Sequence, residues 1–320
     1  MRLFEVAMAT GLVMDGRFAL HDTGEHPECP ERLAAVERGL REAGLMERVV
    51  GIGAREARDE ELELVHDPAY VALVRRESAA GRPALSTGDT VMSAGSLEAA
   101  LLATGGVLAA VEAVVGGRVS NAFCAVRPPG HHATPSAGMG FCFFNHVAVA
   151  TRYAQRRLGI GRVLIVDWDV HHGNGTQDAF YEDGSVLFFS SHQFPWYPGT
   201  GRRDETGRGA GLGLTINAPL PAGSGVREIV GEMEGRLEKA LAGFRPELVM
   251  VSAGFDSRVG DPLGRFELTD ADFAELTRRV MGYGRDYAGG RVLSVLEGGY
   301  NPGTLGGAAA AHVGALVAAG

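Results

Sequence analysis

Residues that can bind a metal ion and move protons occur in five separate short segments of this sequence. The segments contain His131 and His132, then Asp167 to Gly175, then Ser190 to His192, then Asp256, and finally Tyr300. Each segment directly follows a short apolar run that is typical of a buried strand. Because the carboxyl ends of parallel strands line the ligand crevice of an open α/β sheet, we expect the five segments to converge on one site.

A metal centre is predicted from Asp169, His171 and Asp256. Asp169 and His171 are two positions apart, so an extended backbone at the end of a strand would point both side chains to the same face. Three protein ligands with one position left for water is the arrangement of catalytic zinc. Imidazole favours a transition metal over magnesium or calcium, and Fe(II) and Co(II) satisfy the same ligands. Taken alone, the Asp-x-His pair also fits a helix cap followed by a loop histidine.

Groups for acid–base chemistry accompany the predicted metal centre. His131 and His132 follow Pro128 and Pro129, which restrict the backbone, and Tyr300 follows two glycines, which allow close approach to a ligand. A Lewis acid, a proton acceptor and a hydroxyl donor together make a hydrolytic site that needs no covalent nucleophile. The sequence has no GxSxG, Walker or HExxH motif, which disfavours serine hydrolases, phosphate-loop enzymes and zincins.

The elements that must position these groups alternate between strands and helices. Strands are predicted over residues 122–126, 162–167, 186–190, 213–217, 248–252 and 291–296. Helices are predicted over residues 30–43, 67–76, 95–115, 145–158, 226–242, 269–287 and 302–318, the first of them as an exposed amphipathic helix. Alternation of this kind predicts an α/β fold in which helices cover both faces of a parallel sheet. The glycine-rich stretches 81–88 and 199–213 fit loops, so residues 1–320 are expected to form one domain.

Composition excludes several classes of protein. The 320 residues are 45% hydrophobic and 22% charged, as in ordinary globular proteins. The net charge of −9 argues against nucleic acid as a partner. No stretch approaches the roughly 18 apolar residues that span a bilayer, and no leader sequence is evident. Three widely spaced cysteines, Cys29, Cys124 and Cys142, indicate neither a disulfide framework nor a thiolate metal site. We therefore expect a cytoplasmic protein without a membrane partner.

Five long motifs, in order, resemble the histone deacetylase and acetylpolyamine amidohydrolase superfamily. They are RPPGHHA from Arg127, GFCFFN from Gly140, DWDVHHGNGTQ from Asp167, SAGFDSRVGDPLG from Ser252 and LEGGYN from Leu296. The similarity begins at HPECPERL, near the N-terminus, and reaches the last helix. The resemblance implies a three-layer α/β/α, arginase-like fold with a single catalytic domain.

The resemblance also implies a role for each matching residue. Asp169, His171 and Asp256 would hold one zinc ion (Zn²⁺) per chain. His132 would be the general base and then the acid, His131 its electrostatic partner, and Tyr300 the donor to the scissile carbonyl. Asp167 would orient His131, and Asn174 would orient His132. A structural potassium ion (K⁺) is implied as well, held by Asp167 and by backbone carbonyls around Asp169, His171 and Ser190.

Asn174 and Tyr300 refine the comparison within the superfamily. Asn174 stands where class I deacetylases carry aspartate, and HHGNGTQ resembles class II enzymes and bacterial deacetylase-like amidohydrolases. A neutral partner should raise the basicity of His132 less than a carboxylate would. Class IIa enzymes replace the tyrosine by histidine, so Tyr300 predicts real deacetylase activity. A catalytically idle binder of acylated amines is the alternative, and its expected mark, loss of a metal ligand, His132 or Tyr300, is absent.

A narrow tunnel for an aliphatic chain is implied by a further set of motif residues. Its expected substrate-binding residues are Asp89, Gly140, Phe141, Tyr197, Leu263 and Gly299. For the aromatic residues, ordinary core packing is the alternative, and for Asp89 it is a solvated turn. Cys142 fits a small buried hydrophobe better than a nucleophile. Arg32 resembles the arginine near the cavity through which acetate leaves, and a surface salt bridge is its alternative.

Substrate class follows from two further positions. Arginases carry a second aspartate where this chain has Gly173, so a two-manganese guanidine hydrolase is disfavoured. Polyamine-specific members carry rim insertions or an acidic gatekeeper in the GDPxG segment, where this chain has Leu263. The expected substrate is therefore an acyl-lysine peptide or protein, or another N-acylated small molecule, with acetylpolyamine hydrolysis as the alternative. The sequence is compatible with a homo-oligomer.

Overall fold

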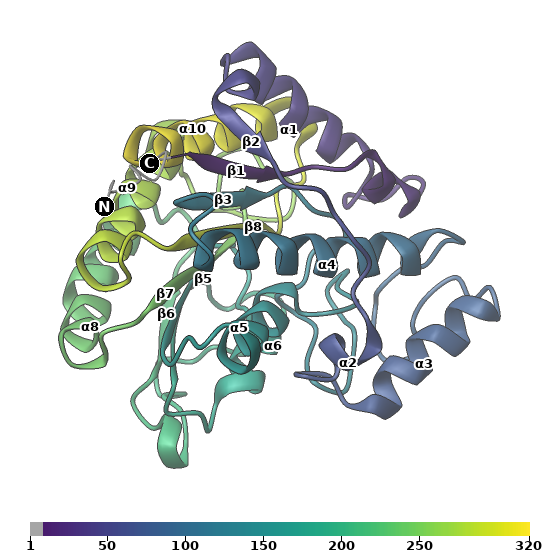
Figure 1. Ribbon diagram of the computed structural model, residues 1–320, viewed down its shortest axis with the longest axis horizontal. Coiled ribbons are helices and arrows are strands. Elements are labelled where there is room, and N and C mark those ends of the chain that lie inside the picture. Colours follow the sequence, from purple (N-terminus) through teal and green to yellow (C-terminus); the bar gives the residue numbers. More distant parts are fainter. Residues whose placement is uncertain (1–8) are drawn as a thin grey trace, which may run out of the picture.

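The computed structural model describes residues 9–320. The expectation that the chain has no leader concerns in part residues 1–8, which lie outside the described residues. Within the described residues, the strands form one parallel sheet of eight in the order β2-β1-β3-β8-β7-β4-β5-β6 (Figure 1). The strands are β1 (Thr10–Val13), β2 (Val49–Gly51), β3 (Asn121–Cys124), β4 (Val163–Asp167), β5 (Val186–Gln193), β6 (Thr215–Leu220), β7 (Leu248–Ala253) and β8 (Val292–Leu296). The six strands predicted from sequence are confirmed, and β1 and β2 were missed.

The predicted helices are all present, with small changes at their ends. The α-helices are α1 (Glu31–Glu42), α2 (Asp59–Leu62), α3 (Pro68–Ala79), α4 (Ser96–Val115), α5 (His146–Arg157), α6 (Asn174–Phe180), α7 (Val226–Glu232), α8 (Glu238–Phe244), α9 (Asp270–Tyr287) and α10 (Pro302–Ala319). The helix predicted over residues 226–242 is α7 and α8 joined by a π turn, η4 (Met233–Leu237). Short 3-10 turns are η1 (Gly16–Leu20), η2 (Met46–Arg48) and η3 (Gly209–Gly211). The short helices α2 and α6 were not predicted from the sequence.

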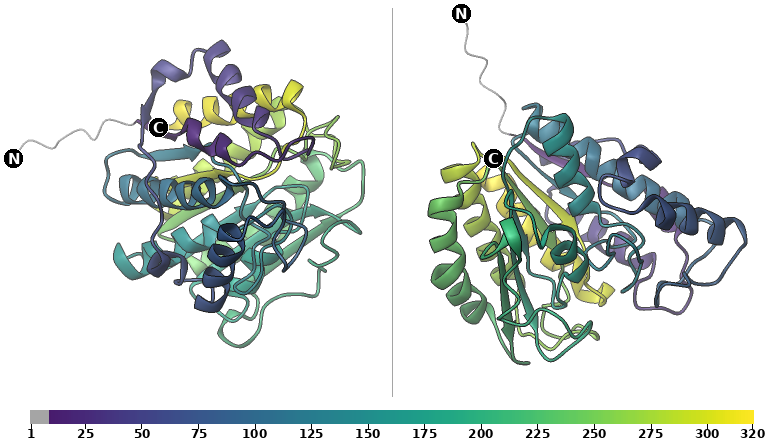
Figure 2. Two further views of the ribbon diagram at one scale, coloured as in Figure 1. Left: turned by 90° about the vertical axis from the view of Figure 1, so that its right-hand side faces the viewer. Right: turned by 90° about the horizontal axis from the view of Figure 1, so that it is seen from below.

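Both faces of the sheet are covered, so the molecule has three layers. Along β4, Leu164 and Val166 join the core under α1, α7, α9 and α10, whereas Val163 and Ile165 join the core under α4 and α5. The right-hand view of Figure 2 shows the sheet between these two sets of helices. A strand that is apolar on both faces gives a continuous apolar run, and this explains why the central strands were found from sequence. The predicted α/β/α architecture is confirmed.

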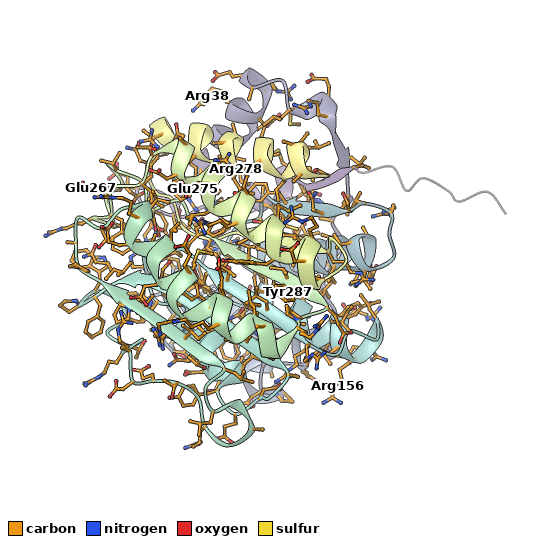
Figure 3. All side chains as sticks on the ribbon, turned by 90° about the vertical axis from the view of Figure 1, so that its left-hand side faces the viewer. Arg38, Arg156, Glu267, Glu275, Arg278 and Tyr287 are labelled. Carbon is orange, nitrogen blue, oxygen red and sulfur yellow. The ribbon has the colours of Figure 1, made fainter. Side chains whose placement is uncertain are left out.

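The helices on the outer layers are amphipathic. Helix α9 buries Phe273, Leu276 and Val280, and its other side carries Glu275 and Arg278 (Figure 3). Helix α1 has a more buried position than expected, because Val36 and Leu40 join the core beneath it. Its charged residues form only one face of the helix.

Helix α4 corrects the expectation about membrane-spanning segments. By length and composition, this helix is apolar enough to cross a bilayer, with a mean hydropathy of 1.7 in its most apolar window. However, 78% of that window is buried within the molecule, against the sheet and α5. The core position accounts for the apolar composition of α4.

Four adjacent central strands deliver the predicted functional segments to one edge of the sheet. In the order β3-β8-β7-β4, these strands end at Cys124, Leu296, Ala253 and Asp167. The segments carrying the histidine pair, Tyr300, Asp256 and Asp169 therefore leave the sheet side by side. β5 lies next to β4 and ends just after His192.

Candidate active site

Asp169, His171 and Asp256 form a buried group that could hold a metal ion. One ligand atom from each residue lies within 4.8 Å of the others, and all three residues are buried. His171 Nδ1 is 3.0 Å from Asp169 Oδ1 and 3.1 Å from Asp256 Oδ2. One nitrogen and two carboxylate oxygens are donors that suit a borderline metal ion such as zinc.

Asp169 and His171 were predicted to share one face of an extended strand end, and this prediction is wrong. β4 ends at Asp167, so both residues lie in the loop beyond the strand and do not share a face of an extended backbone. The loop is turned by Asp169 itself, because its Oδ1 accepts the backbone N–H of His171 over 2.8 Å. This local turn brings the two side chains together.

The charges of the group favour a cation between the carboxylates. Burial raises the pKa of Asp256, and the neighbouring Asp169 raises it further. Burial acts against the charged form of His171, yet its contacts with Asp169 and Asp256 raise its pKa to about 10. Two buried carboxylates that share one imidazole therefore favour positive charge at this point, which is a condition that a divalent metal ion meets.

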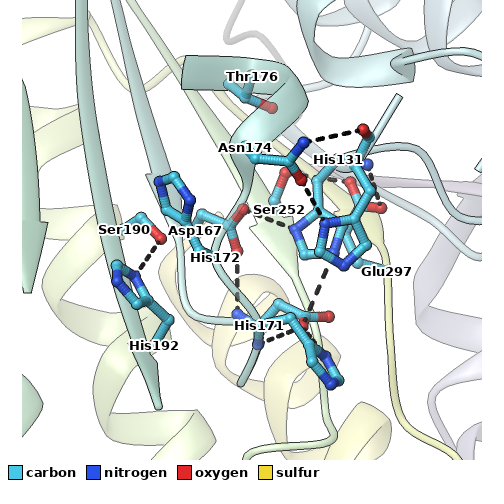
Figure 4. Close-up of polar contacts among 12 residues, drawn as sticks. His131, Asp167, His171, His172, Asn174, Thr176, Ser190, His192, Ser252 and Glu297 are labelled. Atoms are coloured by element: carbon cyan, nitrogen blue, oxygen red, sulfur yellow. Dashed lines mark hydrogen bonds and ion pairs between the residues drawn. The ribbon is translucent and has the colours of Figure 1, made fainter. Parts of the chain in front are cut away.

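His131 and His132 lie beside this group with their rings tilted against each other, and each has a different hydrogen-bond partner; Figure 4 shows His131 with Asp167 and Asn174. Their ring centroids are 4.0 Å apart. His131 Nδ1 lies 2.9 Å from Asp167 Oδ2, and His132 Nδ1 lies 2.8 Å from Asn174 Oδ1. An amide oxygen only accepts, so Nδ1 of His132 carries the hydrogen and Nε2 keeps its lone pair.

The two histidines have opposite charge preferences. Burial lowers the pKa of His132 well below its usual value, and the neighbouring His131 and His171 lower it further. Burial opposes protonation of His131 too, but the charges of Asp169 and Asp167 raise its pKa well above the usual value. These directions favour a neutral His132 beside a protonated His131.

An apolar cavity of about 270 Å³ opens onto these groups. His132, His171 and Tyr300 line it together with the aromatic side chains of Phe141, Trp196 and Tyr197. The remaining lining residues are Asp89, Gly140, Pro262 and Leu263. The structure therefore brings five of the six expected substrate-binding residues to one cavity.

Gly140 and Asp89 hold the wall of the cavity in place. Gly140 has a φ of +57°, and a Cβ at this position would lie 2.2 Å from the His132 ring, so only glycine fits. Its N–H donates to Asp89 Oδ1 over 2.6 Å, and the Tyr197 hydroxyl lies 3.4 Å from the same oxygen. Asp89 is therefore tied to two wall residues and is not a simple solvated turn aspartate.

Trp196 was not singled out from the sequence. Its indole N–H donates to the carbonyl oxygen of Leu263 over 2.9 Å, and the Arg265 guanidinium lies 5.2 Å from the ring centroid. Trp196 thus fixes the segment that carries Leu263 at the cavity. Nothing in the local pattern FPWYPG distinguishes this role from ordinary packing.

Tyr300 is buried and held on several sides. Its ring lies edge-to-face with Phe141 at 5.8 Å between centroids, and its backbone N–H donates to Asp261 Oδ2 over 2.7 Å. Burial raises the pKa of Tyr300 well above its usual value, so the hydroxyl stays protonated. It is a hydrogen-bond donor within the cavity.

Arg32 lies beneath Tyr300 and is fully buried, so the alternative of a surface salt bridge is wrong. Its guanidinium stacks 4.8 Å from the Tyr300 ring centroid and donates to the carbonyl oxygen of Gly299 over 2.6 Å. Its ion-pair partner is the buried Glu28, 2.9 Å away, which Arg127 also contacts. The sequence spacing of 267 residues between Arg32 and Gly299 hid this contact.

Gly299 does not line the cavity, in contrast to the expectation for it. It has a φ of +118°, and an added Cβ would lie 2.8 Å from Leu305. Gly299 thus shapes the turn that presents Tyr300. Cys142 is buried beside Gly140, and burial raises the pKa of its thiol well above the usual value, as expected of a hydrophobe.

Comparisons with known proteins agree with this geometry. The family model of the histone deacetylase domain matches residues 26–316. A probable deacetylase of Archaeoglobus fulgidus is 40% identical over 297 residues, which cover 92% of this chain and 82% of the relative. The polyamine deacetylase HDAC10 of Homo sapiens is 44% identical over 292 residues, covering 87% of this chain but only 43% of the human protein. The crystal structure of the HDA15 HD domain superposes with a TM-score of 0.91 at 38% identity, covering 98% of this chain and 89% of that one.

Proposed function

The chain belongs to the histone deacetylase family and is a deacetylase, and from this premise we propose that it hydrolyses the amide of an acyl-lysine-like substrate with zinc as its metal. The observation that carries the proposal is the apolar, aromatic cavity that opens onto His132, His171 and Tyr300. A long methylene chain fits such a cavity, and the polar groups lie where its acyl amide would react.

Asp169, His171 and Asp256 would hold the zinc ion, one per chain. Their nitrogen and oxygen donors, their burial and their need for a shared cation all fit the metal. When bound, zinc supplies Lewis-acid chemistry that polarises a carbonyl and makes water more acidic.

His132 would move the proton. Because Nδ1 donates to Asn174, the free lone pair on Nε2 takes the proton from the attacking water and later delivers it to the departing amine. His131, held by Asp167, stabilises the anionic groups around it and keeps His132 neutral at the start of the reaction. Asp167 and Asn174 thus orient the pair, each through one Nδ1.

Tyr300 would donate its hydroxyl to the acyl oxygen as negative charge develops there. A donor with a raised pKa stays protonated through turnover and therefore stabilises the oxyanion without losing its proton. Phe141 and Tyr197 would grip the methylene chain, and Asp89 would hold both walls through Gly140 and the Tyr197 hydroxyl.

Acyl-lysine peptides are favoured over polyamines by the side chain at the cavity mouth. Leu263 offers no negative charge to a polyammonium chain at its place in the cavity lining. Acetylpolyamine hydrolysis is the second candidate, and it rests on the printed function of the human relative.

Further expectations remain proposals of the same kind. One continuous sheet supports a single catalytic domain over residues 1–320. A structural potassium ion would lie at Asp167 and the carbonyls around Asp169, His171 and Ser190, since Asp167 and Ser190 are paired in the sheet. We place the enzyme in the cytoplasm, without a nucleic-acid or membrane partner. A homo-oligomer is compatible with this function.

The test is a substrate panel at equal concentration: an acetyl-lysine peptide, N-acetylputrescine and N-acetylspermidine, with Tyr300→Phe as the control. Turnover of the peptide that the variant abolishes supports the proposal. Turnover of polyamines alone would retain the chemistry but reject the substrate. No turnover of any substrate by zinc-loaded protein would favour an idle binder.

A further inference from the structure

Glu297 is a fully buried carboxylate that neither the metal group nor the proton-transfer pair contains. Its Oε2 accepts the backbone N–H of Gly130 over 2.7 Å and that of His131 over 3.1 Å. Its Oε1 accepts the hydroxyl of Ser252 over 3.1 Å. No side-chain ion pair to Glu297 occurs among residues 9–320. Figure 4 shows Glu297 behind the histidine pair, with Ser252 beside it.

The backbone that follows Glu297 is tied to the rest of the active site at successive residues. The N–H of Gly298 donates to Asp169 Oδ2 over 2.8 Å, and the carbonyl of Gly298 accepts from the N–H of Phe255 over 3.0 Å. These bonds connect the segment with one metal-binding side chain and with the neighbour of another, Asp256. The N–H of Tyr300 then donates to Asp261.

The buried Arg32 holds the same segment through its guanidinium group. It donates to the carbonyl oxygens of Glu297 and Gly299, over 2.5 and 2.6 Å. The only part of residues 297–300 that reaches back to the loop of His131 and His132 is the Glu297 carboxylate. Two segments that lie at the ends of different strands, β3 and β8, are thus joined by one side chain.

We propose that Glu297 is a positioning residue, whose carboxylate locks the loop of the general base His132 to the segment of the oxyanion donor Tyr300. The role rests on the proposed function and extends it, since the base and the donor must act on opposite sides of one reacting amide. A small error in their spacing is costly, because a shift of about 1 Å in a reacting group can lower a rate about a hundredfold.

A purely structural role would give a different result. A buried carboxylate without an ion pair is unfavourable, and burial raises the pKa of Glu297 to about 7 although the nearby charge of His131 opposes the rise. If the side chain only filled space or satisfied hydrogen bonds, its loss would change stability but not the turnover of the folded enzyme.

Three variants separate these roles. Glu297→Ala removes both acceptors, whereas Glu297→Gln keeps an amide oxygen that can accept both N–H groups and an NH₂ that can donate to Ser252. Glu61→Ala is the control, because Glu61 is also buried, accepts the N–H of Arg58 over 2.8 Å and lies away from the cavity, although it forms ion pairs with Arg55 and Arg58.

The experiment measures kcat and KM on an acetyl-lysine peptide and amide hydrogen exchange over residues 130–133, in zinc-loaded full-length protein. For Glu297→Ala we expect kcat to fall about a hundredfold with KM within about threefold. Exchange over residues 130–133 should become at least about tenfold faster. Glu297→Gln should recover most of the wild-type kcat and most of the protection from exchange. Glu61→Ala should leave kcat and exchange over residues 130–133 unchanged in the folded protein.

Several outcomes would overturn the role of Glu297. An unchanged kcat in Glu297→Ala would leave only a structural role. An equal fall in kcat in the Glu61→Ala control would lead to the same conclusion. If Glu297→Ala does not fold, Glu297→Asp withdraws the carboxylate by one methylene from the N–H groups of Gly130 and His131, and a wild-type kcat there with wild-type exchange would reject the proposal. Hydrogen exchange needs no substrate, so an inactive wild-type enzyme would refute the proposed function while leaving this test intact.

Discussion

Asn174 Oδ1 lies 2.8 Å from Nδ1 of His132, whereas the adjacent His131 pairs with the carboxylate of Asp167. The proposed general base is thus oriented by a neutral amide. The difference matters because a carboxylate would stabilise the protonated imidazole and an amide does so only weakly. The Asn174 hydrogen bond therefore raises the pKa of His132 only weakly, and burial still holds that pKa well below its usual value.

Asn174→Asp should raise the pKa of His132 and move the acidic limb of the kcat/KM profile to higher pH. A charge this close shifts a pKa by about one unit or more. The base is active when neutral, so a higher pKa means that more acidic solutions lose activity earlier. A pH–rate profile measures the shift. An unchanged acidic limb in folded, zinc-loaded Asn174→Asp would show that another group controls it.

Leu263→Glu should improve turnover of acetylspermidine relative to acetyl-lysine peptide. Leu263 lines the cavity, and Trp196 holds its carbonyl, so the new carboxylate would stay near the mouth. We expect the ratio of kcat/KM values to change about tenfold, equivalent to about 1.4 kcal/mol. Leu263→Gln, of equal length but uncharged, is the control. No difference between the Glu and Gln variants would reject a charge-based selection at this position.

Asp89→Ala should raise KM for the acetyl-lysine peptide about tenfold and leave kcat within a few-fold. Asp89 holds both Gly140 and Tyr197, and a hydrogen bond to a charged group contributes about 1.5 to 3 kcal/mol. Asp89→Asn retains an oxygen acceptor for the Gly140 N–H and should show a smaller effect. Steady-state kinetics of both variants decide the point. A fall in kcat without a change in KM would mean that Asp89 acts on the reaction and not on the walls.

Removal of the metal should lower the thermal stability of the protein as well as its activity. A metal ion that binds only the folded state stabilises it by about 4 kcal/mol at a thousandfold excess over Kd. Calorimetry of chelator-treated protein, with and without added zinc, measures the difference. Asp256→Ala should abolish the zinc-dependent increase. An equal increase in that variant would place the stabilising metal elsewhere.

Acid should destabilise the fold through a buried histidine that does not line the cavity. His312 lies between Thr277 and Ser294, at 2.6 and 2.8 Å, and burial lowers its pKa to about 3. An unfolded histidine takes a proton near pH 6.5, whereas folded His312 stays neutral until the pH is much lower. Its contribution to stability is therefore complete above pH 6.5 and is lost as the pH falls toward 3.

Between pH 7 and pH 5, His312 should account for a loss of about 2 kcal/mol in the free energy of unfolding. His312→Asn should be less stable at pH 7 but should lose less stability on acidification. Urea unfolding at the two pH values measures both slopes. Equal pH dependence in the wild type and the variant would show that His312 is not the group responsible.

The sheet could be predicted from sequence where strands are buried on both faces. β4 and β7 are continuous apolar runs, and the helices between the strands have clear amphipathic patterns. β2 has three residues, Val49–Gly51, and none is buried, so no pattern marks it. β1, Thr10–Val13, is buried but only four residues long.

The proposed metal ligands and the histidine pair could be found because their motifs are long and specific. The physical reason for their convergence could not, because the turn at Asp169 depends on a hydrogen bond within a loop. The contacts of Glu297 with the loop of His131 could not be predicted from the sequence either, since its partners there are backbone N–H groups more than 160 residues away. A contact between a side chain and a distant part of the backbone produces no pattern of residue types from which it could be predicted.

The most direct test is release of acetate from an acetyl-lysine peptide by the zinc-loaded enzyme, compared with His132→Ala and Tyr300→Phe. We expect turnover by the wild type and a loss of at least about a hundredfold in each variant, with zinc content unchanged. Wild-type rates in either variant, or no acetate release by the zinc-loaded wild type from any acylated amine, would contradict the assignment of this site to deacetylation.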